Sequence, residues 1–365
     1  MIILHISPTY YDSGSIIGGG EKYINYMARA ISHAAIARGS KVTNCVLSFG
    51  KQPGIYSVDE YLKCEVINGE PWNPYSINLH DLEIRINAAD IVIIHQCLSK
   101  IGLFIGSHAK LAGKILIGLD HGGGEYYALD YSPEWGRVYD LFLAQSLFAA
   151  NAFKDLEGKI KVILGPIETD YYKPDNRVVK DPKLVVSIGR IMPHKGFDRI
   201  IKALPKSLNL IIAGKNYDTD YFNYLKELSH KSPSKIEIIE GLMDEQVRVL
   251  LHRASLFIQA STHFDYRGTY YHKPELLGLA PLEALSCGTP TLVSSAGALN
   301  ELTSISSCLS FSDDEELSQL LVMHANKLIE WPDNHSIHRQ VINKYGIIAF
   351  GEKLMNELLL LGCHL

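Results

Sequence analysis

Short apolar segments alternate with longer amphipathic segments along the whole chain. The apolar segments are continuous, without an alternation of polar residues, which is typical of parallel strands covered by helices on both faces. In the first half of the chain the predicted strands lie at residues 2–7, 41–49, 90–96, 114–121, 140–146 and 159–165. Between the first two strands, residues 20–39 are predicted to form a helix that ends at Gly39. The first half therefore reads as a doubly wound α/β domain.

The same rhythm starts again after a polar segment with two prolines at residues 168–182. The predicted strands of the second half lie at residues 183–189, 208–214, 235–241, 255–261 and 289–295. We therefore expect an α/β protein with two doubly wound, Rossmann-like domains. The expected parts are an N-terminal domain (1–167), a linker (168–182), a C-terminal domain (183–345) and a C-terminal helix (346–365) that can cross back to the N-terminal domain. Ligands of such sheets bind at the carboxyl ends of the strands, so the loops there are searched for chemistry.

Composition narrows the class of protein. The chain of 365 residues is 47% hydrophobic and 21% charged, as in ordinary soluble globular proteins. A net charge of -5 provides no basic field for nucleic acid. Six cysteines without a CxxC pair argue against zinc and a disulfide framework and favour a reducing compartment. No apolar stretch reaches membrane-spanning length, and the first residues lack the basic start of a signal peptide. A cytoplasmic protein without an integral membrane segment is expected.

Two loops of the first half are candidates for ligand contacts. Gly18, Gly19 and Gly20 lie between the first strand and the first helix, where bare backbone and a helix N-terminus suit an anion. A plain tight turn is the alternative. His121 follows another strand in the sequence GLDHGGGEYY and is either a polar contact in the cleft or a structural histidine. The HGGG run resembles an esterase oxyanion loop, but the chain has no GxSxG, so esterase chemistry is set aside.

The second half places two cations after its first strand. Arg190 and Lys195 flank a proline-containing turn, and they suit a diphosphate because arginine offers a bidentate fork and lysine a point charge. The alternative is a solvated basic loop. Asp218 and Asp220 in KNYDTDYF are interpreted as turn and cap residues in preference to a metal pair.

The stretch PELLGLAPLEALSCGTP (274–290) places two glutamates around a turn. Pro281 is predicted in the first turn of a helix that Gly288 closes, which puts Glu283 in that first turn and Glu275 in the preceding loop. Backbone N–H groups before the helix can meet an anion, and carboxylates accept hydrogen bonds from hydroxyl groups. Such a site suits a ligand with hydroxyls at both ends and phosphate between them, which describes a nucleotide sugar.

These motifs resemble one family. GGGE at 18–21, GRIMPHKG at 189–196 and E-x(7)-E with LGLAPLEALSCGTP are similar, in order and spacing, to the retaining glycosyltransferases of family 4, which have the GT-B fold. VILGPIETDYYKP (162–174) is similar to the interdomain segment of that family, although its usual Asn-Gly-Val-Asp is replaced. The resemblance covers most of the chain and is strongest from about residue 183 to residue 302. It implies two Rossmann-like domains that face each other across a cleft.

The resemblance also implies roles for individual residues. Catalytic roles fall on His121, Arg190, Lys195 and Glu275. Donor-binding roles fall on Gly18, Gly19, Leu277, Gly278, Leu279, Ala280 and Glu283. The glycines and the 277–280 backbone would contact the donor. The two cations would hold the diphosphate and stabilise the leaving group, while the histidine and the first glutamate would contact the transferred sugar. The second glutamate would bind the ribose hydroxyls.

The chain departs from the family in one loop. The segment 261–275 is longer than usual, and Leu276 stands where the family often has glycine. The longer loop adds aromatic residues, of which Tyr266, Tyr270 and Tyr271 are predicted to stack on an acceptor sugar. The alternative is that these rings pack the loop onto its own domain.

The predicted function is retaining transfer of a hexose from a nucleotide-diphosphate sugar to a carbohydrate or carrier-linked acceptor, in polysaccharide or glycoconjugate synthesis. A UDP-sugar of the UDP-glucose type is the first guess, by analogy with the family. No metal or cofactor is expected, because Arg190, Lys195 and a helix N-terminus supply the positive charge. Acidic residues outnumber basic ones over residues 1–170, which disfavours an anionic lipid acceptor but leaves room for weak peripheral contact.

Two alternatives share the architecture: a nucleotide-sugar 2-epimerase and a catalytically inactive nucleotide-sugar-binding protein. The intact charged motifs favour transfer over both. A nicotinamide oxidoreductase is disfavoured because no GxGxxG follows a strand.

Overall fold

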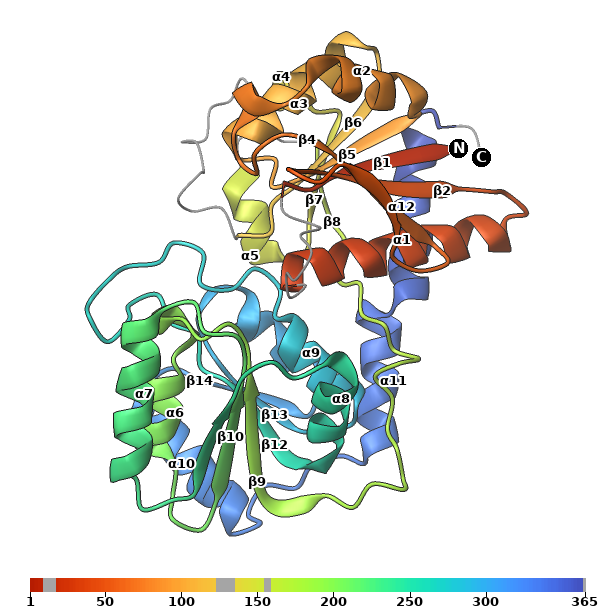
Figure 1. Ribbon diagram of the computed structural model, residues 1–365. Coiled ribbons are helices and arrows are strands. Elements are labelled where there is room, and N and C mark those ends of the chain that lie inside the picture. The colour runs from red at the N-terminus through yellow and green to blue at the C-terminus, as the bar shows by residue number, and fades with distance from the viewer. Residues whose placement is uncertain (9–17, 123–134, 154–158, 364–365) are drawn as a thin grey trace. The chain divides into compact units, whose positions relative to one another are not determined.

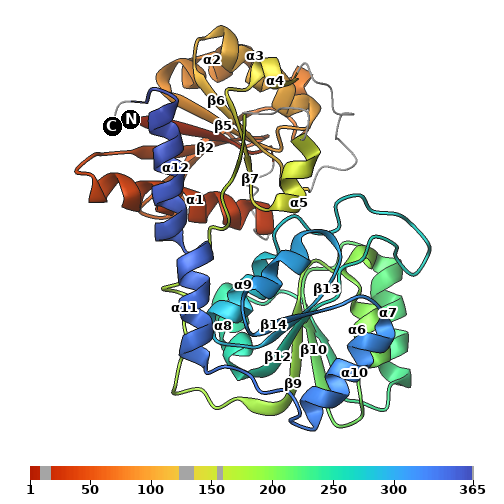
Figure 2. The same cartoon turned by 180° about the vertical axis from the view of Figure 1, so that it is seen from behind.

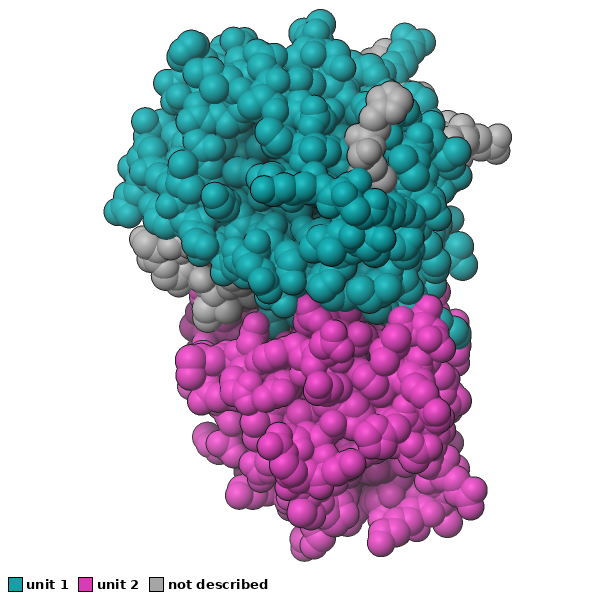
Figure 3. Space-filling view, turned by 90° about the vertical axis from the view of Figure 1, so that its right-hand side faces the viewer, with its two compact units in different colours: residues 1–166, 344–365 teal, residues 167–343 magenta. Residues whose placement is uncertain are grey.

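The computed structural model describes residues 1–8, 18–122, 135–153 and 159–363 (Figure 1). The chain divides into two compact units, coloured separately in Figure 3: unit 1 comprises Met1–Pro166 and Lys344–Leu365, and unit 2 comprises Ile167–Asn343. The segment predicted as a linker, 168–182, belongs to unit 2, where Glu168 and Tyr172 are buried. The chain enters unit 2 as folded structure from Ile167 onwards.

Unit 1 is built on an eight-stranded sheet in the described part of the chain. Its strands are β1 (Ile2–Ile6), β2 (Thr43–Gly50), β3 (Gly54–Ser57), β4 (Leu62–Asn68), β5 (Ile91–His95), β6 (Ile115–Leu119), β7 (Leu141–Ala144) and β8 (Ile160–Val162). Its helices are α1 (Gly19–Ala37), α2 (Leu79–Ala88), α3 (Lys100–Leu111), α4 (Trp135–Val138), α5 (Leu147–Ala150) and α12 (Ile347–Leu360). The strand order is β3-β4-β2-β1-β5-β6-β7-β8, and the pairs are parallel except β3 with β4.

Helices cover both faces of the unit 1 sheet. Leu4 and Ile6 of β1 point to the core that α2 and α3 share, whereas Val46 of β2 packs with Ile24 and Ala28 of α1 on the opposite face. Helix α12 packs across α1 in both ribbon views (Figures 1 and 2). The two helices approach so closely that a Cβ on Gly351 would lie 2.2 Å from the carbonyl oxygen of Ala30. The C-terminal helix thus completes the unit that the N-terminus begins.

Unit 2 contains a six-stranded, fully parallel sheet ordered β11-β10-β9-β12-β13-β14. Its strands are β9 (Asp181–Ile188), β10 (Asn209–Ala213), β11 (Ile236–Ile239), β12 (Ala254–Gln259), β13 (Thr291–Ser294) and β14 (Cys308–Phe311). Its helices are α6 (Phe197–Ala203), α7 (Thr219–Lys231), α8 (Asp244–Arg253), α9 (Leu279–Ser286), α10 (Asp314–Ala325) and α11 (Asn334–Tyr345), the last of which runs into unit 1. Two 3-10 helices, η3 (Pro193–Lys195) and η4 (Gly297–Ser304), lie in its loops.

The order of strands puts a topological switch point in each unit. In unit 1 the chain leaves β1 towards β2 on one side and reaches β5 on the other; in unit 2 the corresponding pair is β9 and β12. Ligands of open α/β sheets bind outside the carboxyl ends of such a pair, because the loops there diverge and leave a crevice. The candidate site residues can therefore be tested against these two positions.

The predicted fold class, two doubly wound parallel sheets, is confirmed. Strands β3, β4 and β14 were not predicted from the apolar segments. Half-buried and exposed positions alternate along β3, which is the edge strand, and its neighbour β4 exposes two of its seven residues, because one face meets solvent at this end of the sheet. No helix in the described ranges is long and apolar enough to cross a membrane.

Candidate active site

The loop after β9 contains a left-handed backbone position that favours glycine. Gly196 follows η3 with φ 67°, and a Cβ there would lie 2.0 Å from the carbonyl oxygen of Ala260. This contact presses the β9 loop against the end of β12, across the switch point of unit 2. The turn that carries Lys195 is therefore held directly beside the loop that carries Glu275.

Lys195 and Glu275, predicted separately for diphosphate and sugar, form an ion pair. The Nζ atom of Lys195 lies 2.8 Å from Oε2 of Glu275, and their side chains are only 10% and 18% exposed. Two charges can be withdrawn from water to this extent because each neutralises the other. The pair leaves the ammonium group with further hydrogen-bonding capacity, because a lysine has three N–H donors.

The backbone of Glu275 is fixed by the start of η4. Gly297 has φ 59°, and a Cβ on it would lie 2.3 Å from the carbonyl oxygen of Glu275. The N–H group of Ala298 donates a hydrogen bond of 3.0 Å to that same oxygen. The Glu275 backbone can therefore keep this position only because residue 297 is a glycine.

Helix α9 begins two residues before Pro281. Gly278 is its N-cap with φ 88°, Leu276 and Leu277 are buried, and Gly288 follows the helix with φ 76°. The predicted helix around Pro281, closed at Gly288, is confirmed. Glu283, however, is the fifth residue of α9 and lies beyond its first turn, because the helix starts at Leu279.

Glu283 is a buried carboxylate, with 4% of its surface exposed. A glutamate that only complements the helix dipole would gain nothing from burial, since solvent is available at a helix start. Its burial beside the N-terminal turn of α9 fits a group held in place for a ligand.

Arg190 lies beside a second cation that sequence reasoning missed. Its guanidinium carbon is 5.8 Å from the ring centre of Tyr217, and Nζ of Lys215 is 5.6 Å from the same ring. Lys215 lies two residues after β10, the strand next to β9, so the two cations come from neighbouring strand ends. The signal was present in the sequence, because a lysine follows the predicted strand 208–214.

His194 lies near the charges of Lys195 and Arg190 and is kept neutral. It is buried, and its Nδ1 has no hydrogen-bond partner among the described residues. Burial, followed by the positive charges of Lys195 and Arg190, lowers the pKa of His194 to about 2. The ring packs against Tyr271 at 4.8 Å between centres. A neutral imidazole in this position adds no further charge to the cationic loop.

The long loop at 263–272 is fastened to its own unit. Tyr266 stacks on Tyr224 of α7 with 4.5 Å between ring centres, and Arg267 pairs with Asp218 at 3.4 Å. Asp265 accepts hydrogen bonds from the backbone N–H of Arg267 and of Thr269 and from the Tyr271 hydroxyl. Tyr266 and Tyr271 therefore hold the loop in place, as the packing alternative expected.

Tyr270 behaves differently from the other two tyrosines. It is 47% exposed and contacts Phe264, which is 62% exposed, and His272. These three rings form an exposed aromatic cluster that is accessible to another molecule, and Tyr266 is also 37% exposed.

Asp218 is the N-cap of α7, where it accepts a hydrogen bond from the N–H of Tyr221, so its interpretation as a cap residue is confirmed. Within the described ranges, no group of three or more His, Cys, Asp or Glu side chains could hold a metal ion.

The predicted residues of unit 1 lie together at the start of α1. Gly18 is the N-cap of α1 and its N–H donates to Oε2 of Glu21 at 3.0 Å, with Gly19 as the first helical residue. A Cβ on Gly20 would be only 3.6 Å from Cβ of His121, so the glycine turn and the histidine adjoin. The remaining residues of both loops, 14–17 and 123–127, fall outside the described residues.

Two histidines of unit 1 went unnoticed in the sequence. His95 contacts His121, and His5 contacts His95, each through ring nitrogens at hydrogen-bonding distance. Both lie inside apolar strands, in IILHIS and DIVIIHQ, where a polar residue is unusual. That pattern is the signal that could have found them.

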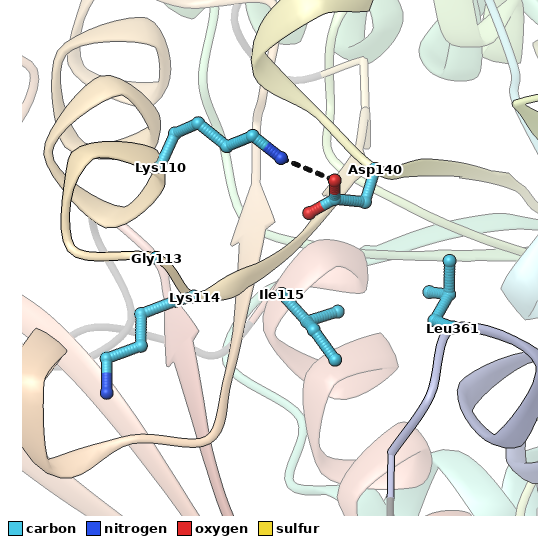
Figure 4. A pocket seen from close by; sticks show the side chains of 6 residues that line it. All are labelled: Lys110, Gly113, Lys114, Ile115, Asp140 and Leu361. Carbon is cyan, nitrogen blue, oxygen red and sulfur yellow. Dashed lines mark hydrogen bonds and ion pairs between the residues drawn. The ribbon is translucent and has the colours of Figure 1, made fainter.

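A small cavity of unit 1 is lined by none of the predicted site residues (Figure 4). It has a volume of about 250 Å³ and is lined by Lys110, Gly113, Lys114, Ile115, Asp140 and Leu361. Lys114 and Asp140 precede β6 and β7, so the cavity lies at the amino ends of these strands. Ligands of doubly wound sheets bind at the opposite ends, and a Lys110–Asp140 ion pair of 2.5 Å occupies this one.

The fold and the sites define a GT-B protein: two doubly wound units with charged and glycine-containing loops at the carboxyl ends of their strands. Residues 168–323 match the family described as glycosyl transferases group 1. The match includes the loops with Arg190, Lys195, Glu275 and Glu283.

Known proteins support this assignment. An uncharacterized glycosyltransferase of Methanocaldococcus jannaschii is 26% identical over 273 residues, which cover 69% of this chain and 62% of that protein. The chain thus spans less than two thirds of this relative. Among solved structures, Anabaena HepE in complex with UDP has a TM-score of 0.73 at 16% identity, covering 98% of this chain and all of that one. WaaG, a glycosyltransferase involved in lipopolysaccharide biosynthesis, has a TM-score of 0.64 at 15% identity, covering 97% and 99%. At these identities the structural likeness concerns the fold.

Proposed function

We propose that the protein transfers a hexose from a nucleotide-diphosphate sugar to a carbohydrate acceptor, with retention of anomeric configuration. The observation that carries the proposal is the buried Lys195–Glu275 pair at the switch point of unit 2. We assign the cation of this pair to the diphosphate and its carboxylate to the sugar hydroxyls. The pair lies within the segment that matches the glycosyl transferase family.

The donor is proposed to be a UDP-sugar, with UDP-glucose as the first candidate. Support comes from the structural neighbour HepE, which has been solved with UDP and with UDP-glucose. In this chain Arg190 and Lys195 bind the diphosphate, and the N–H groups from Gly278 to Ala280 meet it at the start of α9. Glu283 accepts hydrogen bonds from the ribose hydroxyls.

The chemistry follows from where charge develops. The bond between the anomeric carbon and the diphosphate oxygen breaks, and a bond to the acceptor hydroxyl oxygen forms on the same face of the sugar. The acceptor proton leaves with the diphosphate. Negative charge on the departing diphosphate grows in the transition state, so cations held in place beforehand lower the barrier. We propose that Arg190 and Lys195 do this without a metal ion or a cofactor.

The acceptor is proposed to contact the exposed aromatic cluster of Phe264, Tyr270 and His272, because flat rings stack on the apolar faces of sugars. Tyr270→Ala is expected to raise the KM for the acceptor several-fold without altering donor binding. Tyr75→Ala, which removes a tyrosine that is 88% exposed in unit 1, serves as the matched control. An unchanged acceptor saturation curve for the Tyr270 variant would remove the cluster from the acceptor site.

The donor experiment is a thermal-shift panel with uridine, guanosine and adenosine diphosphates and their sugars. A ligand that binds only the folded chain raises its stability by mass action, about 2.7 kcal/mol at a concentration of 100 Kd. We expect the largest shift with uridine nucleotides. Release of nucleoside diphosphate that depends on added acceptor then establishes transfer, whereas an epimerase converts the sugar without needing an acceptor. A panel without any nucleotide response would overturn the proposal. We also propose a cytoplasmic location, with room for weak peripheral membrane contact.

A further inference from the structure

Four side chains form a hydrogen-bonded row across unit 1. Asn44, His5 and His95 belong to β2, β1 and β5, and His121 follows β6, so the row crosses four neighbouring strands. Oδ1 of Asn44 lies 3.3 Å from Nε2 of His5, and Nδ1 of His5 lies 3.0 Å from Nε2 of His95. Nδ1 of His95 lies 2.7 Å from Nε2 of His121. We call this row the histidine chain.

The histidine chain lies on the face of the sheet that α1 covers. Asn44 contacts Ala28 and Ser32 in the middle of α1, and His121 contacts the ring of Tyr23 near the start of the same helix. The row therefore leads from the buried interior to the glycine turn at the start of α1. His5 and His95 are 0% and 1% exposed, and Asn44 is 2% exposed, whereas His121 is half-buried. Burial keeps water from the first three side chains, so their hydrogen bonds have to be satisfied internally.

The orientation of the Asn44 amide is set by its neighbours. Its Nδ2 lies 3.2 Å from the carbonyl oxygen of Ala28 and 3.5 Å from that of Tyr61. Carbonyl oxygens only accept hydrogen bonds, so the NH2 group has to point to them. Oδ1 is left facing His5 as an acceptor. The Nε2 atom of His5 must therefore carry the proton.

One tautomer then determines the next. A neutral imidazole has one N–H and one acceptor nitrogen. With its proton on Nε2, His5 offers Nδ1 as an acceptor, which requires His95 to donate from Nε2. His95 in turn accepts at Nδ1, which requires His121 to donate from Nε2. The Nδ1 atom of His121 is thereby left as an acceptor.

The histidines remain neutral, as this argument requires. Burial lowers the pKa of His5 and of His121 to about 4, and it holds the pKa of His95 well below its ordinary value. Asp120, next to His121, acts in the opposite direction but does not reverse the effect of burial. The nitrogens face one another in pairs instead of converging on one point, which is a hydrogen-bonded arrangement and not a metal site.

We propose that Asn44, His5 and His95 are positioning residues that hold His121 in the tautomer protonated at Nε2. In this state the Nδ1 atom of His121 accepts a hydrogen bond from a ligand and cannot donate one. It selects a hydroxyl group, which carries a proton, over an ionised phosphate oxygen, which carries none. That the ligand hydroxyl belongs to the donor sugar rests on the proposed function; the tautomer does not.

The direct test is nitrogen NMR of the intact chain labelled with 15N-histidine, without any ligand. One-bond and two-bond couplings separate a protonated from an unprotonated ring nitrogen, and His121→Gln assigns the resonances by their loss. We expect His5, His95 and His121 all to be protonated at Nε2 at neutral pH. A proton on Nδ1 of His121, or a charged ring, would overturn the proposal.

Substitution at the far end of the chain tests control at a distance. Asn44→Leu removes the acceptor that fixes His5, so His121 is expected to show a mixture of tautomers. Asn44→Asp keeps an acceptor oxygen and is expected to retain the Nε2–H form. His95→Gln and His95→Leu form a second pair in case the Asn44 variants do not fold, because glutamine can both donate and accept. His80→Gln, an exposed histidine of the same unit, is the control.

Ligand binding tests the selectivity of His121 for a hydroxyl group separately from its tautomer. For Asn44→Leu we expect affinity for the nucleotide sugar to fall about tenfold, the value of one hydrogen bond, while affinity for the free nucleoside diphosphate stays within about twofold. Asn44→Asp should restore most of the loss. A folded Asn44→Leu protein with a mixed tautomer and unchanged nucleotide-sugar affinity would overturn the selective role. Wild-type protein with the expected tautomer but no transfer activity would instead overturn only the proposed function.

Discussion

Breaking the Lys195–Glu275 pair tests whether the two charges depend on each other. We consider Lys195→Met, Glu275→Gln and the double variant. Each single variant leaves one charge in a site that was built for two. The double variant removes both charges and keeps similar side-chain volumes.

The magnitude follows from the distance and the burial. At 2.8 Å, two unit charges attract each other by about 6 kcal/mol at an effective dielectric constant of about 20, before desolvation is subtracted. Removal of one partner from a fully buried pair costs about 3–5 kcal/mol, whereas an exposed pair is worth at most about 1 kcal/mol. Because the Glu275 side chain is 18% exposed, we expect each single variant to lose about 2–3 kcal/mol. The double variant should lose less than the sum of the two.

Urea unfolding of unit 2 measures this difference. Trp331 is the only tryptophan in the sequence of unit 2, so replacing Trp72 and Trp135 by Phe leaves its fluorescence as a reporter of that unit. Lys183→Met, at an exposed lysine of β9, is the control and should stay within about 0.5 kcal/mol of the parent.

The double-mutant cycle decides the outcome. We expect a coupling free energy of about 2 kcal/mol between the two positions. Additive losses, with a coupling below about 0.5 kcal/mol, would refute the interdependence of the pair. Lys195→Met should also abolish most transfer, since it removes a cation proposed to stabilise the leaving group.

Three further outcomes are expected. Gly297→Ala should destabilise unit 2 by more than Gly241→Ala and should weaken nucleotide-sugar binding. The new Cβ at position 297 would meet the Glu275 carbonyl oxygen at 2.3 Å, whereas at Gly241, which also has a positive φ, it would meet nothing within 4 Å. Equal losses of stability in urea unfolding would argue against the steric reasoning. The free energy of unfolding should fall as the pH is lowered from about 6.5 to 4. His5 and His121, with pKa values of about 4, stay unprotonated in the folded chain over this range, whereas the unfolded chain binds protons at these histidines. The loss at pH 5 is about 2 kcal/mol per histidine, and equal stability at pH 7.5 and pH 5 would contradict their neutral state. Transfer should continue in EDTA, and its loss with rescue by manganese would show that the arginine and lysine of the β9 loop are not sufficient.

The sheets could be predicted because their strands are apolar on both faces. Strands such as β1 and β5 stand out as continuous runs wherever helices cover both sides. The edge strand β3 and its neighbour β4 could not be found in this way, since residues that face solvent interrupt their apolar pattern. Pairing between strands is also invisible in one sequence, and pairing is what brings His5 beside His95.

The sequence could mark candidate residues but not the contacts between them. Arg190, Lys195 and Glu275 were marked because they are charged residues that follow strands. The direct ion pair between Lys195 and Glu275 arises from the close approach of Gly196 to Ala260, which lies 64 positions later in the chain. The start of α9 was misjudged because a left-handed glycine can begin a helix before a proline, which moved Glu283 into the second turn. The tyrosines of the long loop divide into packed and exposed rings only once α7 is seen beside them.

The return of α12 to α1 sets an order for synthesis. Unit 2 is continuous in sequence and ends at Asn343, whereas unit 1 needs the last helix to cover α1. On the ribosome, the whole of unit 2 is therefore synthesised before α12. Until then the face of α1 around Ala30 lacks its partner, although α1 precedes unit 2 in the chain. A nascent chain that ends between α11 and α12 would carry the residues of unit 2 in full and a unit 1 whose α1 is uncovered.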